Sequence, residues 1–153
     1  MSDEDLINLE EFLPYRLSVL SNTVSNAIAE GYRGRFGLSI PDWRVMAVLA
    51  RFPGSSAQEL VRWTGMDKVA VSRGVSRLLE RGLLQREVAA EDRRRSELRL
   101  SEVGREVYAK IVPMAKNYET QLLHSLSAEQ HSSLNQILVN LQQAAEQLSA
   151  TNN

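Results

Sequence analysis

Residues 56–82, SAQELVRWTGMDKVAVSRGVSRLLERG, decide the fold. Ser56 followed three positions later by Glu59 is the capping-box pattern of a helix start, and Gly65 is well placed to end that short helix. Asp67, two residues further on, is a good cap for a second and longer helix. Two helices joined by so tight a turn predict a helix-turn-helix.

The second helix, expected over residues 68–81, has two chemically different sides. At about 100° per residue, its core side carries Val71, Val75 and Leu78. The opposite side and its flanks carry small apolar, hydroxyl and basic side chains, namely Val69, Ala70, Ser72, Arg73, Ser76 and Arg77. Arginine binds guanine edges or phosphate and small apolar groups contact thymine methyls, so this side fits a DNA major groove. The alternative is an exposed amphipathic helix with ordinary arginines.

The period changes to two over residues 83–100, which predicts a β-hairpin with a long polar connection. That connection holds Arg93, Arg94 and Arg95, and an arginine at such a projecting tip fits a narrow A·T-rich minor groove. Asp92 is expected to pair with one of these arginines and to stabilise the shape of the tip. The alternative is a solvated charged turn. A helix-turn-helix followed by a basic hairpin is a winged helix.

Long amphipathic helices are expected on both sides of this lobe. Apolar residues recur three and four apart from Leu6 to Ala27, and again from Leu134 to Leu148. A small domain does not need such helices unless something covers them, and a second copy of the chain is the nearest cover. The alternative is a monomeric bundle in which the terminal helices pack on the chain's own winged helix.

The expected fold class is therefore mainly α with a small β-hairpin wing: a winged helix-turn-helix with long N- and C-terminal dimerisation helices. We expect one intertwined domain with an N-terminal dimerisation helix, a DNA-binding lobe and C-terminal dimerisation helices. The corresponding boundaries are 1–37, 38–101 and 102–153, with a recognition helix at about 68–81 and a wing at about 83–100.

Charge and composition favour a nucleic-acid partner and exclude several other classes. The 153-residue chain has a net charge of −1, but residues 62–99 hold ten basic and six acidic side chains. The alternative for this basic middle is a solvated charged surface. The absence of cysteine excludes disulfides, thiolate metal sites and cysteine nucleophiles. No apolar run approaches the ~20 residues that span a bilayer, and the acidic N-terminus is no secretory signal, so we expect a cytoplasmic location.

Five stretches carry a more specific signal: Ser56-Ala57-Gln58-Glu59-Leu60, Val71-Ser72-Arg73, Leu78-Leu79-Glu80-Arg81-Gly82-Leu83-Leu84, Glu91-Asp92-Arg93-Arg94 and Leu98-Arg99-Leu100-Ser101-Glu102-Val103-Gly104. Together they resemble the MarR family of bacterial transcriptional regulators. The most specific motif is Asp-Arg-Arg followed by Leu-x-Leu-Ser-x-x-Gly. The resemblance covers nearly the whole chain, including the long helices on both sides.

The resemblance implies a homodimer with interlocked terminal helices, in which each winged helix binds half of a pseudo-palindromic DNA site. By motif position, Arg94 is the wing arginine near the minor groove and Asp92 is its partner. Members often have Ser or Thr where this chain has Val69 and Ala70, so we expect a different operator. The candidate DNA-binding residues are Gln58, Lys68, Val69, Ala70, Ser72, Arg73, Ser76, Arg77, Arg93, Arg94 and Arg95.

The resemblance also implies release of DNA by a small, often aromatic acid that binds between the dimer arms and the DNA-binding lobe. Arg16, Trp43 and Met46 are the candidates for that site, although Trp43 and Met46 also fit a plain core and Arg16 a plain surface. Without cysteine the chain cannot be one of the family's cysteine-based peroxide sensors. His124 and His131 lack nearby acid or thiol support, so we expect neither a metal nor another cofactor.

Three classes of function have to be distinguished for this chain. The favoured one is a dimeric, sequence-specific DNA-binding regulator, expected to be a repressor relieved by a small molecule, with double-stranded DNA and a second copy as partners. The alternative is a winged-helix protein-interaction module without DNA binding, although three adjacent arginines argue for DNA. An enzyme is not expected, because the sequence has no nucleotide-binding loop, activated nucleophile or metal-ligand cluster.

Overall fold

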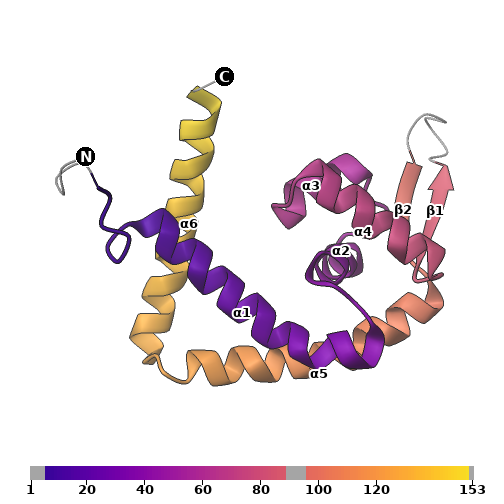
Figure 1. Ribbon diagram of the computed structural model, residues 1–153, viewed down its shortest axis with the longest axis horizontal. Helices are drawn as coiled ribbons and strands as arrows, with labels where there is room; N and C mark the ends of the chain where they lie inside the picture. The colour runs from indigo at the N-terminus through magenta and orange to yellow at the C-terminus, as the bar shows by residue number, and fades with distance from the viewer. Residues whose placement is uncertain (1–5, 89–95, 152–153) are drawn as a thin grey trace. The chain divides into compact units, whose positions relative to one another are not determined.

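The computed structural model describes residues 6–88 and 96–151. The chain divides into two compact units, Met1–Met114 and Ala115–Asn153. The first unit holds helices α1 to α4, a two-stranded hairpin and the first part of α5 (Figure 1). The second unit holds the end of α5 and all of α6.

The first helix begins later than the apolar spacing predicts. The spacing favours a helix from Leu6 onward, whereas α1 spans Leu13–Phe36. Pro14 explains the difference, because it lies in the first turn, where its missing N–H leaves no hydrogen bond unmade. Extending the helix toward Leu6 would press the proline ring against the Glu10 carbonyl.

The next three helices include the two that residues 56–82 predict. They are α2 (Ile40–Arg51), α3 (Ala57–Thr64) and α4 (Lys68–Glu80). Ser56 and Glu59 form the predicted capping box of α3, with the Glu59 N–H donating to the Ser56 hydroxyl at 3.2 Å. The Asp67 carboxylate accepts the Ala70 N–H of α4 at 2.8 Å. The predicted helix-turn-helix is therefore confirmed.

The predicted hairpin is also confirmed. Strands β1 (Leu84–Val88) and β2 (Ser96–Leu100) pair antiparallel, with Leu84 opposite Leu100. Leu84, Leu98 and Leu100 are buried on one side of the hairpin. An additional bridge from Leu98 to Ser55 ties β2 to the loop before α3. The hairpin is thus attached to the helix-turn-helix and shares its core.

The core lies where the helices and the hairpin meet. Its buried apolar residues come from both sides of the predicted lobe: Ala29, Tyr32, Leu38, Val45, Met46, Leu49, Leu60, Val71, Val75, Leu78, Leu83, Leu84, Leu98, Leu100 and Ile111. Each fully buried aliphatic side chain contributes about 1.5–3 kcal/mol to folding. The contribution of α1 through Ala29 and Tyr32 shows that the lobe's core extends beyond residues 38–101.

A close backbone contact attaches α5 (Glu102–Leu123) to the lobe. The Ser101 hydroxyl accepts the Gly104 N–H at 2.9 Å and donates to the Gly82 carbonyl at 2.6 Å. A Cβ atom on Gly104 would lie 2.0 Å from the Leu83 carbonyl oxygen. Only glycine fits at this position, which is the glycine of the Leu-x-Leu-Ser-x-x-Gly motif.

The second unit has little core of its own. Its main helix, α6 (Ala128–Thr151), begins with a capping box of Ser127 and Gln130. No described residue from Ala115 to Thr151 is buried. Across residues 6–88 and 96–151, no helix has a stretch that is both long and apolar enough to cross a membrane.

Candidate nucleic-acid interface

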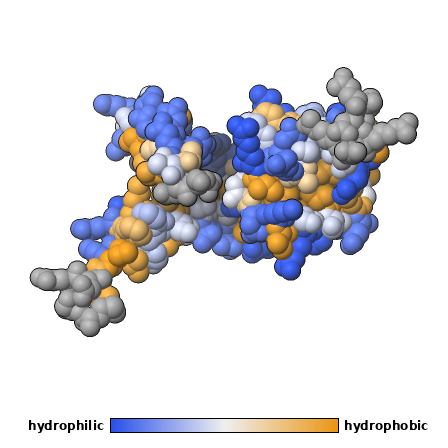
Figure 2. Space-filling view, turned by 90° about the horizontal axis from the view of Figure 1, so that it is seen from above, coloured by the Kyte–Doolittle hydropathy of each residue, from blue (hydrophilic) through white to orange (hydrophobic). Residues whose placement is uncertain are grey.

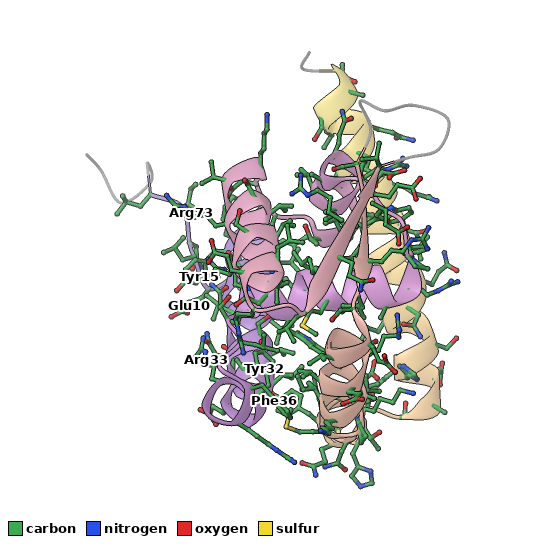
Figure 3. All side chains as sticks on the ribbon, turned by 90° about the vertical axis from the view of Figure 1, so that its right-hand side faces the viewer. Glu10, Tyr15, Tyr32, Arg33, Phe36 and Arg73 are labelled. Atoms are coloured by element: carbon green, nitrogen blue, oxygen red, sulfur yellow. The ribbon has the colours of Figure 1, made fainter. Side chains whose placement is uncertain are left out.

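The predicted recognition helix α4 presents one side to the core and another to solvent. Val71, Gly74, Val75 and Leu78 are buried against the rest of the lobe. On the outer side, Arg73 is exposed and projects from the helix (Figure 3). Val69 is 57% exposed one turn earlier. The outer side of α4 therefore carries an apolar group and a cation one turn apart.

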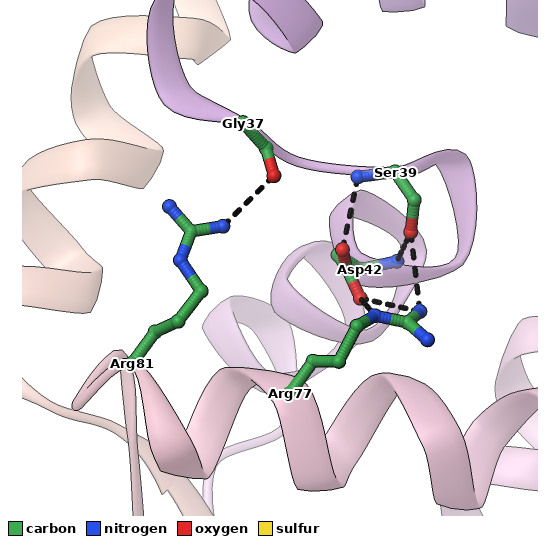
Figure 4. A network of polar contacts seen from close by, with 5 residues as sticks. All are labelled: Gly37, Ser39, Asp42, Arg77 and Arg81. Atoms are coloured by element: carbon green, nitrogen blue, oxygen red, sulfur yellow. Dashed lines mark hydrogen bonds and ion pairs between the residues drawn. The ribbon is translucent and has the colours of Figure 1, made fainter.

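Arg77, a candidate DNA contact, is also bound to the fold, while its side chain stays 43% exposed. Its Nε and Nη2 atoms donate to Oδ1 of Asp42 at 3.1 and 2.8 Å, and Nη2 also donates to the Ser39 hydroxyl at 3.2 Å (Figure 4). Asp42 is only 3% exposed, and its other oxygen accepts the Ser39 N–H at 2.9 Å. The pair fastens the middle of α4 to the N-terminus of α2.

Arg81 makes a second fastening that the sequence did not indicate. Its guanidinium donates to the Gly37 carbonyl at 2.9 Å and to the Phe36 carbonyl (Figure 4). These carbonyls belong to the last residue and the C-cap of α1, where a cation is favourable. Together Arg77 and Arg81 hold the C-terminal half of α4 against the α1–α2 junction. The N-terminal half of α4 is not held by these contacts.

A cleft of about 570 Å³ separates α4 from the hairpin. It brings together four predicted DNA-binding residues, Gln58, Lys68, Ser72 and Ser76, and adds Arg86 of β1. The remaining lining residues are Ala57, Val61, Val71 and Val75. Of the lining residues that the structure describes, Lys68 and Arg86 are cationic and none is acidic. Arg86 was missed in the sequence, although its place two residues after inward-facing Leu84 put it on the inner side of the hairpin.

The outer side of the same hairpin has a different charge pattern. Arg99 is flanked by Glu87 at 3.3 Å and Glu97 at 3.2 Å. This cluster contains more acid than base, whereas the inner side presents Arg86 alone toward the cleft. Positive charge on the described part of the hairpin is therefore directed toward α4. The predicted tip residues, Asp92, Arg93, Arg94 and Arg95, lie outside the described residues.

The three candidate effector residues do not share one site. Trp43 lies between Tyr32 and Tyr108, with ring centroids 5.7 and 5.4 Å away, and is half-buried. Met46 is fully buried in the core. Arg16 lines a shallow groove of about 470 Å³ on α1 that includes neither Trp43 nor Met46.

Polar and charged groups lie next to the aromatic rings around Trp43. Burial raises the pKa of the Tyr32 hydroxyl, while the nearby Arg33 and Arg44 act in the opposite direction. The hydroxyl is therefore neutral at physiological pH and remains a hydrogen-bond donor. Arg44 is anchored to α1 through the Ser25 hydroxyl at 3.1 Å.

The fold and this surface define a winged helix-turn-helix protein, because a capped helix pair leads directly into a hairpin that faces the second helix. A model of the MarR family matches residues 36–95, which include α2, the helix-turn-helix and β1. The transcriptional regulator HosA of Escherichia coli O127:H6 is 30% identical over 101 residues, covering 66% of this chain and 75% of HosA. The chain belongs to the MarR family of transcriptional regulators.

Solved structures agree with this assignment. A MarR/EmrR family transcriptional regulator from Acinetobacter sp. ADP1 has a TM-score of 0.85 and 28% identity, covering 92% of this chain and 99% of that one. BpsR of Bordetella bronchiseptica, whose DNA binding is regulated by 6-hydroxynicotinic acid, has a TM-score of 0.78. BpsR is 19% identical, over 90% of this chain and 97% of its own, so its likeness shows the fold alone.

Proposed function

We propose that this chain is a homodimeric, sequence-specific DNA-binding regulator that inserts α4 into the major groove. The observation that carries the proposal is the outward side of α4, where exposed Arg73 and Val69 stand on a helix fastened to the fold by Arg77 and Arg81. A fixed helix with a free cation and a free apolar group suits base-edge contact. Gln58 and Lys68 are proposed to flank it.

The wing is proposed to act beside α4. Arg94 would enter the adjacent minor groove with Arg93 and Arg95 near the backbone, and Asp92 would stabilise the tip. These assignments rest on the sequence motif and on the pairing of β1 with β2, which confirms the hairpin that carries the motif.

Dimerisation is supported by apolar surface that a single chain leaves uncovered. In the first unit, exposed apolar residues gather at the start of α1 and just before it, namely Leu6, Ile7, Leu9, Phe12, Leu13, Leu17, Val19 and Leu20. Figure 2 shows hydrophobic residues, in orange, at the surface of the molecule. In the second unit, α6 exposes Ile137, Leu138, Val139 and Leu148. A two-fold partner covers such patches on both copies at once.

We further propose that binding represses transcription and that a small aromatic acid releases the DNA. The group of Tyr32, Trp43 and Tyr108 supports an aromatic ligand here, because half-buried Trp43 stacks on Tyr108 and Arg44 is nearby as a cation. Arg16 would contribute only if a second copy brought its groove to this site.

The test is selection of bound duplexes from a random pool with the full-length protein, followed by gel shifts of the selected duplex at several salt concentrations. We expect enrichment of a two-fold symmetric site and an affinity that falls steeply with salt. Aromatic acids are then screened for release of that duplex. No enrichment and no shift at moderate salt would favour a protein-interaction module instead.

A further inference from the structure

We propose that the cleft between α3, α4 and β1 holds the sugar-phosphate backbone of one DNA strand, with Arg86 as its main phosphate ligand. This inference rests on the proposed DNA binding and deepens it. It assigns a function to a residue that neither the helix face nor the wing motif had indicated.

The position of the cleft is the first argument. If α4 occupies a major groove and the hairpin reaches the neighbouring minor groove, the strand that separates the two grooves must pass between them. The space between α4 and β1 is this cleft, about 570 Å³ in volume. A backbone strand is therefore the part of a duplex that lies there.

The lining chemistry is the second argument. Arg86 and Lys68 supply cations, Ser72 and Ser76 supply hydroxyl donors, and Gln58 supplies an amide, all of which are usual phosphate partners. Among the described residues, no carboxylate lines the cleft. The accessible alkyl groups of Ala57 and Val61 suit the apolar edges of deoxyribose.

The charge pattern of the hairpin is the third argument. Arg86 and Arg99 lie on neighbouring strands, but Arg99 lies between two glutamates on the outer side. Arg86 forms no hydrogen bond or ion pair with another residue in the described part of the chain, and it is exposed to the cleft. A cation without an internal partner, facing hydroxyl groups, is available for an anion.

A consequence is that Ser72 and Ser76 serve the backbone rather than the bases. Contacts with the DNA bases are then made by the side of α4 that carries Val69 and Arg73. The two sides of one helix would make different contributions, one independent of sequence and one dependent on it.

The test compares Arg86→Gln with Arg99→Gln, two variants with the same loss of charge on opposite sides of the hairpin. Full-length proteins are titrated with the selected duplex and with a shuffled duplex of equal length, over a range of salt concentrations. We expect Arg86→Gln to lose on the order of 10-fold in affinity for both duplexes and to flatten the slope of log K against log salt by about one. Arg99→Gln should retain the wild-type slope, and Arg86→Lys should restore it.

The outcomes separate the two proposals. A wild-type slope for Arg86→Gln, with wild-type binding intact, overturns the cleft assignment and leaves the proposed function standing. Loss on the selected duplex alone would show that Arg86 reads a base, which also overturns it. If wild-type protein binds neither duplex, the proposed function fails and the cleft assignment fails with it. Thermal melts of all variants identify any loss that comes from unfolding.

Discussion

At the scale of single residues, the arginines of α4 have different functions although they look alike in the sequence. Arg73 projects to solvent, Arg77 binds buried Asp42, and Arg81 binds the end of α1. Of the three, only Arg73 makes no hydrogen bond or ion pair with another residue of the described chain. The distinction depends on Asp42, which lies 35 residues from Arg77 in the chain.

Replacing Arg77 should destabilise the protein more than replacing Arg73. Arg77→Ala leaves the Asp42 carboxylate buried with only its bonds to the Ser39 segment, and we expect a loss of about 1–3 kcal/mol in the free energy of unfolding. Arg73→Ala should stay within about 0.5 kcal/mol of wild type, because the side chain is exposed. Urea unfolding followed by circular dichroism measures both values. Equal stability of the two variants would contradict the fastening role of Arg77.

DNA binding should show a different order of effects. We expect Arg73→Ala to cost ~1–3 kcal/mol on the selected duplex and much less on a shuffled one, because a base contact is lost. Competition gel shifts with both duplexes provide the measurement. A loss of the same size on both would identify Arg73 as a phosphate contact.

The buried hydroxyl of Tyr32 predicts a dependence of stability on alkaline pH. Its pKa in the folded state is raised above the ordinary 10.0 by burial, so folding favours the protonated form. The resulting stability is complete below that ordinary pKa and is lost as pH rises through the folded one. Tyr32→Phe should therefore lose less stability than wild type above about pH 10, measured by urea unfolding across that range. Parallel curves for the two proteins would contradict this.

At the scale of elements, local signals determined most of what could be predicted. The boundaries of α2, α3 and α4 follow from Ser39, Ser56, Asp67 and the glycines, because caps act within one helical turn. The spacing of apolar residues predicts too early a start for α1, because that spacing takes no account of the constraint that Pro14 imposes. Arg81 and the cleft around Arg86 depend on residues far apart in the chain, and no spacing rule reports such contacts.

Arg94 is expected to act through the position of a whole element, the hairpin, rather than through one buried contact. Arg94→Ala should weaken binding of the selected duplex and reduce any preference for A·T-rich flanks, since an arginine in a narrow minor groove responds to its width. Selection repeated with the variant protein gives both quantities. Unchanged affinity and unchanged flanking preference would rule out the minor-groove role of Arg94.

At the scale of the whole molecule, the exposed apolar surfaces of α1 and α6 predict the assembly. We expect the wild-type chain to sediment as a dimer and Leu138→Asp to sediment as a monomer, because a carboxylate in a closed apolar interface has no partner. Val103→Asp is the matched control, since Val103 is exposed to a similar extent but lies at the start of α5. A dimer that survives Leu138→Asp would place the interface elsewhere.

In the proposed complex, two copies of the protein bind one duplex symmetrically. Each copy places α4 in the major groove and the hairpin beside it. Hydroxyl-radical footprinting of the selected duplex with full-length protein tests this most directly. We expect two symmetric sets of protected sugars. The centres of the two half-sites should be separated by one helical turn, ~10 base pairs, or by a multiple of one turn. A single asymmetric footprint, or uniform protection regardless of sequence, would contradict it.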